Sequence, residues 1–272
     1  MSPELSPQVF SILGALIEER TGIHYSAEDR GLVADKLAGR LVEAGFDSFL
    51  DYYYFLRYDP AGLLEMDALI DAIVVGETYL FREYDQLVFL IDDIVMPAVA
   101  AGRRMRIWSA ACASGEEPFT LAMMLLRRAA LDSVHLVASD ISRRALERAR
   151  RGVLPRRALR QLPPIEVSGF WDELPGGALE LSRTIRDAVD FRRVNLVDQQ
   201  AVAALGTFDV ILCRNVLIYF DDATARRVVE ILSSALVAGG VLIVGVAESL
   251  LRFGTSLVSE ERRGTFYYRR PC

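Results

Sequence analysis

The pattern of hydrophobic and polar positions changes near residue 105. Over residues 5–57 apolar side chains recur at helical spacing, as in Val9–Glu19. Gly22 and Gly45 supply stops, and Asp47-Ser48 is a good cap for a third helix. Asp59-Pro60 ends that helix, and the sequence LLEMDALIDAIV predicts a fourth. These features predict a small helical domain at the start of the chain.

From Met105 onward, short apolar strands alternate with longer helices. The predicted strands are MRIWSA (105–110), VHLVAS (134–139), FDVILC (208–213) and VLIVGVA (241–247), and the helices between them cover 117–129, 142–151 and 223–236. This alternation is typical of βαβ units in a mostly parallel sheet. The terminal GTFYYRR (264–270) predicts a last, antiparallel strand.

Between residues 152 and 195 the alternation stops. Pro155, Pro163-Pro164 and Pro175-Gly176-Gly177 interrupt the segment, and ALELSRTIRDAVDF (178–191) suits short antiparallel strands. We therefore expect an inserted β-subdomain over about residues 153–192.

Composition narrows the class of protein. Of 272 residues, 52% are hydrophobic and 25% charged, which excludes a disordered chain. No apolar run is long enough to cross a bilayer, and the N-terminus lacks the features of a secretory signal. Cys112, Cys213 and Cys272 lie far apart without a CxxC motif, which argues against a disulfide framework or a zinc site. The expectation is a cytoplasmic protein with no metal centre and no membrane insertion.

Charge is unevenly distributed along the chain. Residues 1–75 carry 5 basic and 13 acidic side chains, a net charge of −8, and the remainder carries 26 against 24, a net charge of +2. Nucleic-acid binding favours a basic face, so this distribution argues against it. There are only 2 histidines, which makes a His-based hydrolase a weak interpretation.

The segment after the first strand has the small residues of a ligand-binding turn. Ala110–Gly115 precedes a helix, but neither GxGxxG nor a phosphate loop is present. Glu116 and Glu117 follow, and carboxylates repel pyrophosphate but suit a ligand with an ammonium group or hydroxyls. S-adenosylmethionine fits that description. An equally good interpretation is that both glutamates complement the helix dipole.

Two more segments end at the carboxyl edge of the predicted sheet. Asp140 follows the second strand, where an acidic residue can accept hydrogen bonds from ribose hydroxyls. The alternative is an N-cap for the helix near Ser142. Arg214, Asn215 and Tyr219 follow the strand FDVILC and reach the edge at which open α/β folds bind ligands.

Several segments together resemble the protein-glutamate O-methyltransferases of the CheR type along nearly the whole chain. The segments are VGETYLFRE (75–83), RIWSAACASGEEPFTLAM (106–123), ASDIS with ALERARRGV, Val194-Asn195-Leu196, FDVILCRNVLIYFD (208–221) and AGGVLIVGVAES (238–249). The combination of GEEP with CRNVLIYF is highly specific.

The resemblance implies a fold, a reaction and a partner. The fold is a Rossmann-like α/β methyltransferase domain over 96–272 with a small antiparallel β-subdomain, preceded by an all-α domain over 1–74 and a linker over 75–95 that contributes to the cofactor site. The reaction is methylation of glutamate side chains, with S-adenosylmethionine as methyl donor and S-adenosylhomocysteine as product. The implied partner is the cytoplasmic helical domain of a chemoreceptor, and the implied state of the enzyme is a monomer.

The resemblance also implies site residues. Tyr219 would lie near the methyl group, as the residue assigned to catalysis. The implied cofactor-binding residues are Gly76, Thr78, Arg82, Glu116 (or its neighbour Glu117), Asp140, Asn195, Leu196, Arg214 and Asn215. The chain departs from the family at Gly76, where Asn is usual, and at Val246–Ser249, where a His-Ser-Glu-Asn-like turn is usual.

Two other interpretations compete with this one. A methyltransferase of the same fold could act on a nucleic acid or a small molecule, or a catalytically silent module could sense S-adenosylmethionine. The family's receptor-facing helix is usually basic, and its counterpart here offers Arg30, Lys36 and Arg40 in an acidic domain. A denser arginine run over residues 143–160 is either a solvated face or a surface that steers an acidic helical substrate.

Overall fold

The structure is a computed structural model that describes residues 4–160 and 165–272. By their internal contacts the residues form two compact units. The first comprises the chain up to Val75 together with Tyr219–Thr224, and the second comprises Gly76–Ile218 and Ala225–Cys272. We call them the helical unit and the sheet unit.

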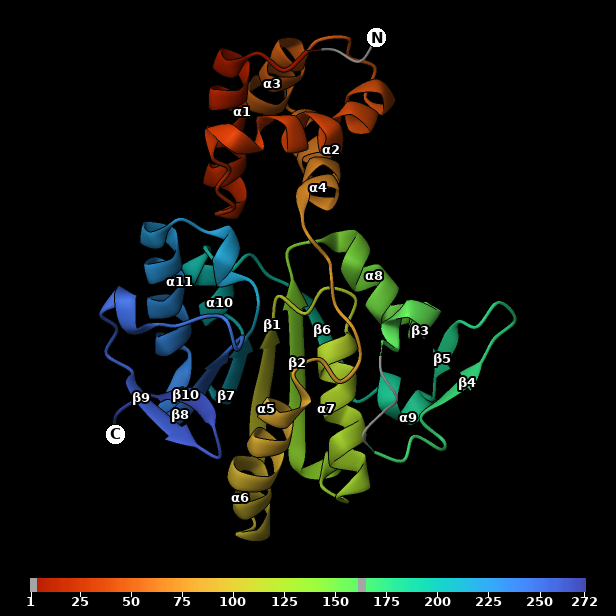
Figure 1. Ribbon diagram of the computed structural model, residues 1–272, viewed down its shortest axis with the longest axis vertical. Coiled ribbons are helices and arrows are strands. Elements are labelled where there is room, and N and C mark those ends of the chain that lie inside the picture. The colour runs from red at the N-terminus through yellow and green to blue at the C-terminus, as the bar shows by residue number, and fades with distance from the viewer. Residues whose placement is uncertain (1–3, 161–164) are drawn as a thin grey trace. The chain divides into compact units, whose positions relative to one another are not determined.

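The helical unit contains the four helices that the hydrophobic spacing predicts. They are α1 (Pro7–Thr21), α2 (Arg30–Glu43), α3 (Phe49–Tyr58) and α4 (Gly62–Ile73) (Figure 1). The Ser6 hydroxyl caps α1 by accepting from the Val9 amide, and Gly22 ends that helix in the left-handed conformation. A separate 3-10 turn at Ala27–Asp29 comes directly before α2.

Two of the three basic side chains expected on α2 make contacts within the helical unit. The Lys36 ammonium donates to the Ile73 carbonyl at 2.6 Å, and burial lowers the pKa of Lys36. The Arg40 guanidinium binds both carboxylate oxygens of Glu65, at 2.6 and 2.8 Å. These two charges therefore stabilise the helix packing of their own unit.

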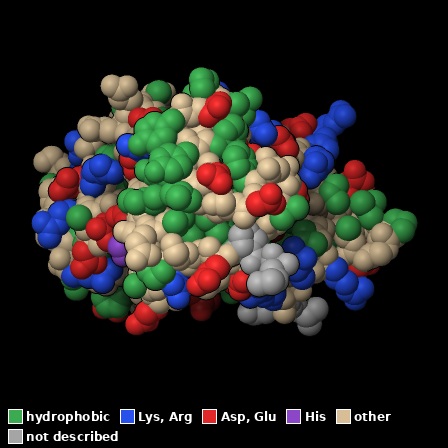
Figure 2. Space-filling model, turned by 90° about the horizontal axis from the view of Figure 1, so that it is seen from above, with side chains coloured by type: hydrophobic (Ala, Val, Ile, Leu, Met, Phe, Trp, Pro, Cys, Tyr) green, Lys and Arg blue, Asp and Glu red, His purple; other side chains and the backbone are tan. Residues whose placement is uncertain are grey.

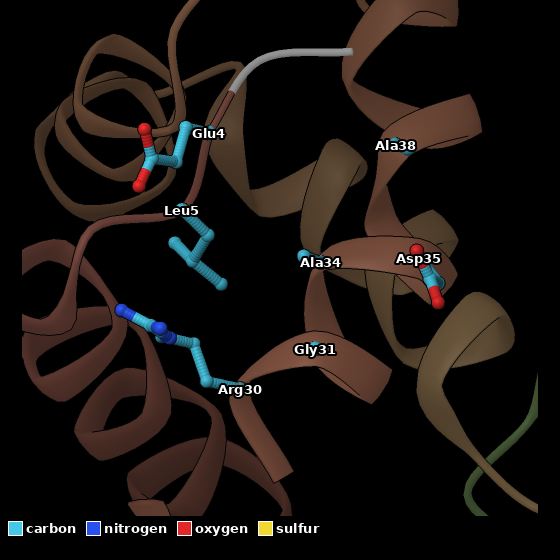
Figure 3. A pocket seen from close by; sticks show the side chains of 7 residues that line it. All are labelled: Glu4, Leu5, Arg30, Gly31, Ala34, Asp35 and Ala38. Atoms are coloured by element: carbon cyan, nitrogen blue, oxygen red, sulfur yellow. The ribbon is translucent and has the colours of Figure 1, made fainter. Parts of the chain in front are cut away.

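An open pocket of about 290 Å³ also lies in the helical unit (Figure 3). Gly31, which has no side chain, and the small residues Ala34 and Ala38 line it along α2, and Leu5 points toward them. None of the lining residues is a predicted site residue.

The sheet unit is built on a seven-stranded sheet in the order β6-β2-β1-β7-β8-β10-β9. The bounds are β1 (Met105–Ala110), β2 (Val134–Asp140), β6 (Val189–Arg193), β7 (Phe208–Cys213), β8 (Leu236–Val244), β9 (Val258–Arg262) and β10 (Thr265–Arg269). The first five named here pair in parallel, and β10 is antiparallel to β8. The Rossmann-like fold and the antiparallel last strand are confirmed.

Helices connect the strands and cover the sheet. They are α5 (Tyr84–Phe89), a π-helix at Leu90–Val95, α6 (Met96–Ala100), α7 (Glu116–Arg127), α8 (Arg143–Arg151), α9 (Arg183–Arg186), α10 (Gln199–Ala203) and α11 (Asp222–Ser234). Trp108 and Phe208 are fully buried with ring centroids 5.3 Å apart. Phe119 of α7 and Leu212 of β7, also fully buried, belong to one hydrophobic core. None of the described helices is long and apolar enough to cross a membrane.

A second, three-stranded antiparallel sheet has the order β3-β5-β4 and lies at the right of the sheet unit in Figure 1. Its strands are β3 (Val153–Leu154), β4 (Trp171–Glu173) and β5 (Leu179–Leu181). The antiparallel interpretation of residues 178–191 is wrong at its end, because Val189–Arg193 is β6 and pairs in parallel with β2. Pro163-Pro164 lies outside the described residues.

Candidate functional site

The loop between β1 and α7 is a tight turn. Ala111, Ala113 and Gly115 have φ angles of 59°, 48° and 94°. A Cβ on Gly115 would lie 2.8 Å from the Phe119 ring and 3.1 Å from the Ala149 methyl, so only glycine fits there. The small residues therefore let the backbone run close to its neighbours at the N-terminus of α7.

Asp140 fastens this loop to the end of β2. Its carboxylate accepts from the Ala113 amide at 2.8 Å and from the Ser142 amide at 2.8 Å. The N-cap interpretation of Asp140 is wrong, since the Ser142 hydroxyl caps α8 by accepting from the Ala145 amide. Asp140 thus joins the loop before α7 to the start of α8.

Glu116 is buried at the start of α7. Only 2% of its surface is exposed, and the Ser114 hydroxyl donates to it at 2.9 and 3.0 Å. Burial raises the pKa of Glu116, and the Ser114 hydrogen bond together with the charges of Arg148 and Arg157 offsets this only in part. The Glu116 carboxyl is thus buried, and its neighbours compensate only in part for the cost of ionising it.

Glu117 is instead the partner of Arg214. The Arg214 Nη1 donates to the Glu117 carboxylate at 2.7 Å, and the Ser109 hydroxyl donates to the same group at 2.6 Å. The Arg214 side chain is 2% exposed, so this ion pair is buried. The first turn of α7 is therefore tied to the carboxyl ends of β1 and β7.

The linker segment before α5 reaches the same place through Glu83. The Glu83 carboxylate accepts from Arg214 Nη2 at 3.0 Å, from the Asn215 side-chain amide at 3.1 Å and from the Val246 amide at 3.2 Å. Burial alone would raise the pKa of Glu83, but the Arg214 charge and these hydrogen bonds outweigh burial and lower that pKa. Phe81 and Glu83 both have left-handed φ angles, of 62° and 50°.

Glu248 holds the turn after β7. Its carboxylate accepts from the backbone amides of Asn215 (2.7 Å), Leu217 (2.9 Å) and Gly245 (2.7 Å). Asn215 has a φ of 58°, and a Cβ on Gly245 would lie 2.6 Å from its side-chain nitrogen. One carboxylate thus fixes a positive-φ residue that follows directly after Arg214.

The other predicted residues take varied positions. Gly76 is exposed, Thr78 is half-buried, and Arg82 donates to the Glu77 carbonyl at 3.1 Å. The Asn195 side chain accepts from the Val197 amide at 3.3 Å, and Leu196 is buried. Tyr219 belongs to the segment grouped with the helical unit, where its carbonyl accepts from the His24 amide at 2.9 Å.

Comparison with known proteins agrees with this architecture. The model of the CheR methyltransferase all-alpha domain matches residues 8–74, and that of the CheR methyltransferase SAM binding domain matches residues 76–263. The chain belongs to the CheR methyltransferase family.

Curated relatives of this family match along most of their length. Chemotaxis protein methyltransferase 2 of Vibrio cholerae is 35% identical over 92% of this chain and 89% of its own. Chemotaxis protein methyltransferase 1 of the same species is 37% identical over 90% of each chain. The chemotaxis protein methyltransferase of Borreliella burgdorferi is 31% identical over 86% of each chain. The protein is a methyltransferase that uses S-adenosylmethionine.

The residues present suit S-adenosylmethionine. Within the described part of the chain, the buried Arg214 Nε has no hydrogen-bond partner, so a donor remains beside the cluster of Glu83 and Glu117. The turn at Gly115 lets a ligand approach the backbone closely, and Asp140 is a carboxylate at the end of β2, the chemistry that suits ribose hydroxyls.

Glu83 and Glu248 had no predicted role. Glu83 lies in VGETYLFRE and Glu248 in VGVAES, so both stand in segments that carry the family resemblance. A buried guanidinium requires an acidic partner, so the burial of Arg214 implies that a carboxylate lies beside it. Nothing in the spacing told which glutamate would supply it.

Proposed function

We propose that this enzyme transfers the methyl group of S-adenosylmethionine to glutamate side chains of chemoreceptor cytoplasmic helices. Membership of the CheR family, together with the chemotaxis names of its relatives, is the observation that carries the proposal. The carboxylate cluster at the ends of β1, β2 and β7 supports it, because those strand ends form the edge at which such folds bind ligands.

Each binding residue has a proposed task that follows from its chemistry. Asp140 would accept hydrogen bonds from the ribose hydroxyls. The Glu116 carboxylate and the Arg214 guanidinium would meet the ammonium and carboxylate of the amino-acid end. Thr78, Arg82, Asn195 and Leu196 would complete the lining, with Gly76 and Asn215 contributing backbone.

The reaction places few demands on protein side chains. When bound, S-adenosylmethionine supplies a methyl group on a positively charged sulfur. A glutamate side chain with an ordinary pKa of about 4.3 is already ionised at neutral pH, so no general base is required. The protein must align the two groups and exclude water. We assign Tyr219 to orienting the reacting groups and not to proton transfer.

The decisive experiment uses the full chain, labelled S-adenosylmethionine and a chemoreceptor cytoplasmic fragment. The expected result is base-labile label that maps to glutamate residues of the fragment. The matched control is the same fragment with those glutamates replaced by alanine, which should take up no label. Label on another residue type, or none on any receptor fragment from the same cell, would refute the proposal.

A further inference from the structure

A dense group of arginines covers α8 and the turn that follows it. These side chains are exposed, and Figure 2 shows blue side chains on the side of the molecule where the small sheet lies in Figure 1. The group comprises Arg143, Arg144, Arg148, Arg150, Arg151, Arg156, Arg157 and Arg160. None of them is among the predicted cofactor-binding residues.

Some of these arginines have structural tasks. Arg150 donates to the Phe191 carbonyl at 2.9 Å, and Arg160 pairs with Glu77 at 2.7 Å. By contrast, no carboxylate of the described residues lies within ion-pair distance of the four that we call the arginine surface. Its members are Arg148, Arg151, Arg156 and Arg157. Four exposed charges with no carboxylate of the described residues at ion-pair distance produce a positive local field.

The arginine surface extends from the candidate site to the small sheet. At one end, the charges of Arg148 and Arg157 act on Glu116, the buried carboxyl at the start of α7. At the other end, the Arg156 stem lies over Gly177 between β4 and β5, where a Cβ would come within 3.0 Å of its Cδ. The surface is thus continuous with the place where the methyl donor is expected.

We propose that the arginine surface binds the acidic face of the helical substrate segment that carries the target glutamates. This inference rests on the proposed function, because a segment with several glutamates is acidic by its own chemistry. Residues 1–75 have a net charge of −8 and would repel such a segment, whereas the rest of the chain has a net charge of +2. Opposite charge speeds association and orients the partner.

The test compares two double variants of the full chain with equal change of charge. Arg151→Gln with Arg156→Gln removes two charges from the arginine surface and leaves Arg148 and Arg157, whose charges act on Glu116, in place. Arg226→Gln with Arg227→Gln removes two exposed charges from α11, in the same unit, as the control. The quantities measured are kcat and KM for a chemoreceptor cytoplasmic fragment, the Kd of that fragment, and the Kd of S-adenosylmethionine, each at low and high salt.

The surface variant should lose about tenfold in kcat/KM at low salt, through a weaker Kd for the fragment, with kcat unchanged. The loss should shrink at high salt, and the control should resemble the wild type. Equal losses in both variants, or no loss in the surface variant, would overturn the inference. A wild type that binds the fragment in this salt-dependent manner but methylates no glutamate would refute the proposed function and leave the arginine surface in place.

Discussion

A single carboxylate at the end of β2 combines a structural task with a proposed ligand task. The Asp140 carboxylate accepts hydrogen bonds from the backbone amides of Ala113 and Ser142, so it shapes the loop before α7 whether or not a ligand is bound. A substitution to alanine would remove both tasks at once. The variant Asp140→Asn keeps one acceptor oxygen and removes the charge, and so it separates the two.

Asp140→Asn should raise the Kd of S-adenosylmethionine by at least about tenfold, since a hydrogen bond to a charged acceptor contributes about 1.5–3 kcal/mol. Its thermal midpoint should change less than that of Asp140→Ala. Calorimetric titration and thermal unfolding of both variants provide the measurement. An unchanged Kd in folded Asp140→Asn would remove Asp140 from the ribose assignment.

Gly76 is the position at which the chain departs from the family's asparagine, and the structure leaves room to restore it. No atom lies within 4 Å of a Cβ built there, and Gly76 has no left-handed φ angle. Gly76→Asn should therefore fold normally and bind S-adenosylmethionine about two- to twelvefold more tightly, which corresponds to one neutral hydrogen bond of about 0.5–1.5 kcal/mol. The control is Gly76→Ala, titrated in the same buffer, which adds a Cβ but no hydrogen bond. Equal or weaker binding by Gly76→Asn would mean that the linker does not contact the cofactor at this residue.

Glu116 offers a pH-dependent prediction. Burial raises its pKa in the folded chain, so ionisation of Glu116 opposes folding. The cost is absent below the unfolded pKa of about 4.3, grows as pH rises and is complete above the folded pKa. Glu116→Gln removes the charge and with it this cost. The free energy of unfolding of the variant, minus that of the wild type, should therefore increase as pH rises from about 4 to about 8. Denaturant titrations at several pH values measure the difference. A difference that stays constant with pH would show that Glu116 has an ordinary pKa.

At the scale of elements, the turn after β7 depends on a glutamate in the turn that follows β8. The Glu248 carboxylate accepts hydrogen bonds from the backbone amides of Asn215, Leu217 and Gly245. Removing it would leave these three N–H groups without their acceptor. Glu248→Ala should lower the free energy of unfolding by at least about 3 kcal/mol, since each of the three poorly solvated donors costs about 1–3 kcal/mol. Denaturant titration measures it, with Glu261→Ala on the exposed face of β9 as the control. Equal stability of the two variants would mean that water replaces the carboxylate.

The elements themselves were largely predictable because burial imposes a period on the sequence. Strands such as Phe208–Cys213 are buried on both faces and read as continuous apolar runs. Val189–Arg193 was misread because it is an edge strand with exposed arginines at its end, so its pattern does not differ from that of a short antiparallel strand. β9 is exposed along nearly its whole length and left no apolar signal at all.

The candidate site was predictable only in part, for a different reason. Asp140 and Arg214 follow strands, and strand ends converge at one edge whatever the rest of the chain does. Glu83 reaches Arg214 through a linker in which Phe81 and Glu83 adopt left-handed angles. Neither phenylalanine nor glutamate favours the left-handed conformation, so local propensity does not predict this path of the linker.

At the scale of the whole molecule, the chain forms two compact units with separate cores. Leu37 is fully buried in the helical unit, and Leu212 of β7 is fully buried in the core of the sheet unit. The matches of two family models, to residues 8–74 and 76–263, divide the chain near the same position. We expect the two units to unfold as separate cooperative units, as contiguous cores commonly do.

Hydrogen exchange of the full chain tests this expectation with two matched core substitutions. Leu37→Ala should reduce the protection of amides in α1 to α4 by the equivalent of about 2–5 kcal/mol, the usual cost of such a cavity, and leave that of β1, β2 and β7 nearly unchanged. Leu212→Ala should do the reverse. The segment Tyr219–Thr224 tests the assignment of residues to units most directly. By its contacts it belongs to the helical unit, although it follows β7 in sequence. Its amides should lose protection with Leu37→Ala. If either substitution lowered protection equally in both units, the chain would be one cooperative unit and the boundary near residue 75 would have no thermodynamic meaning.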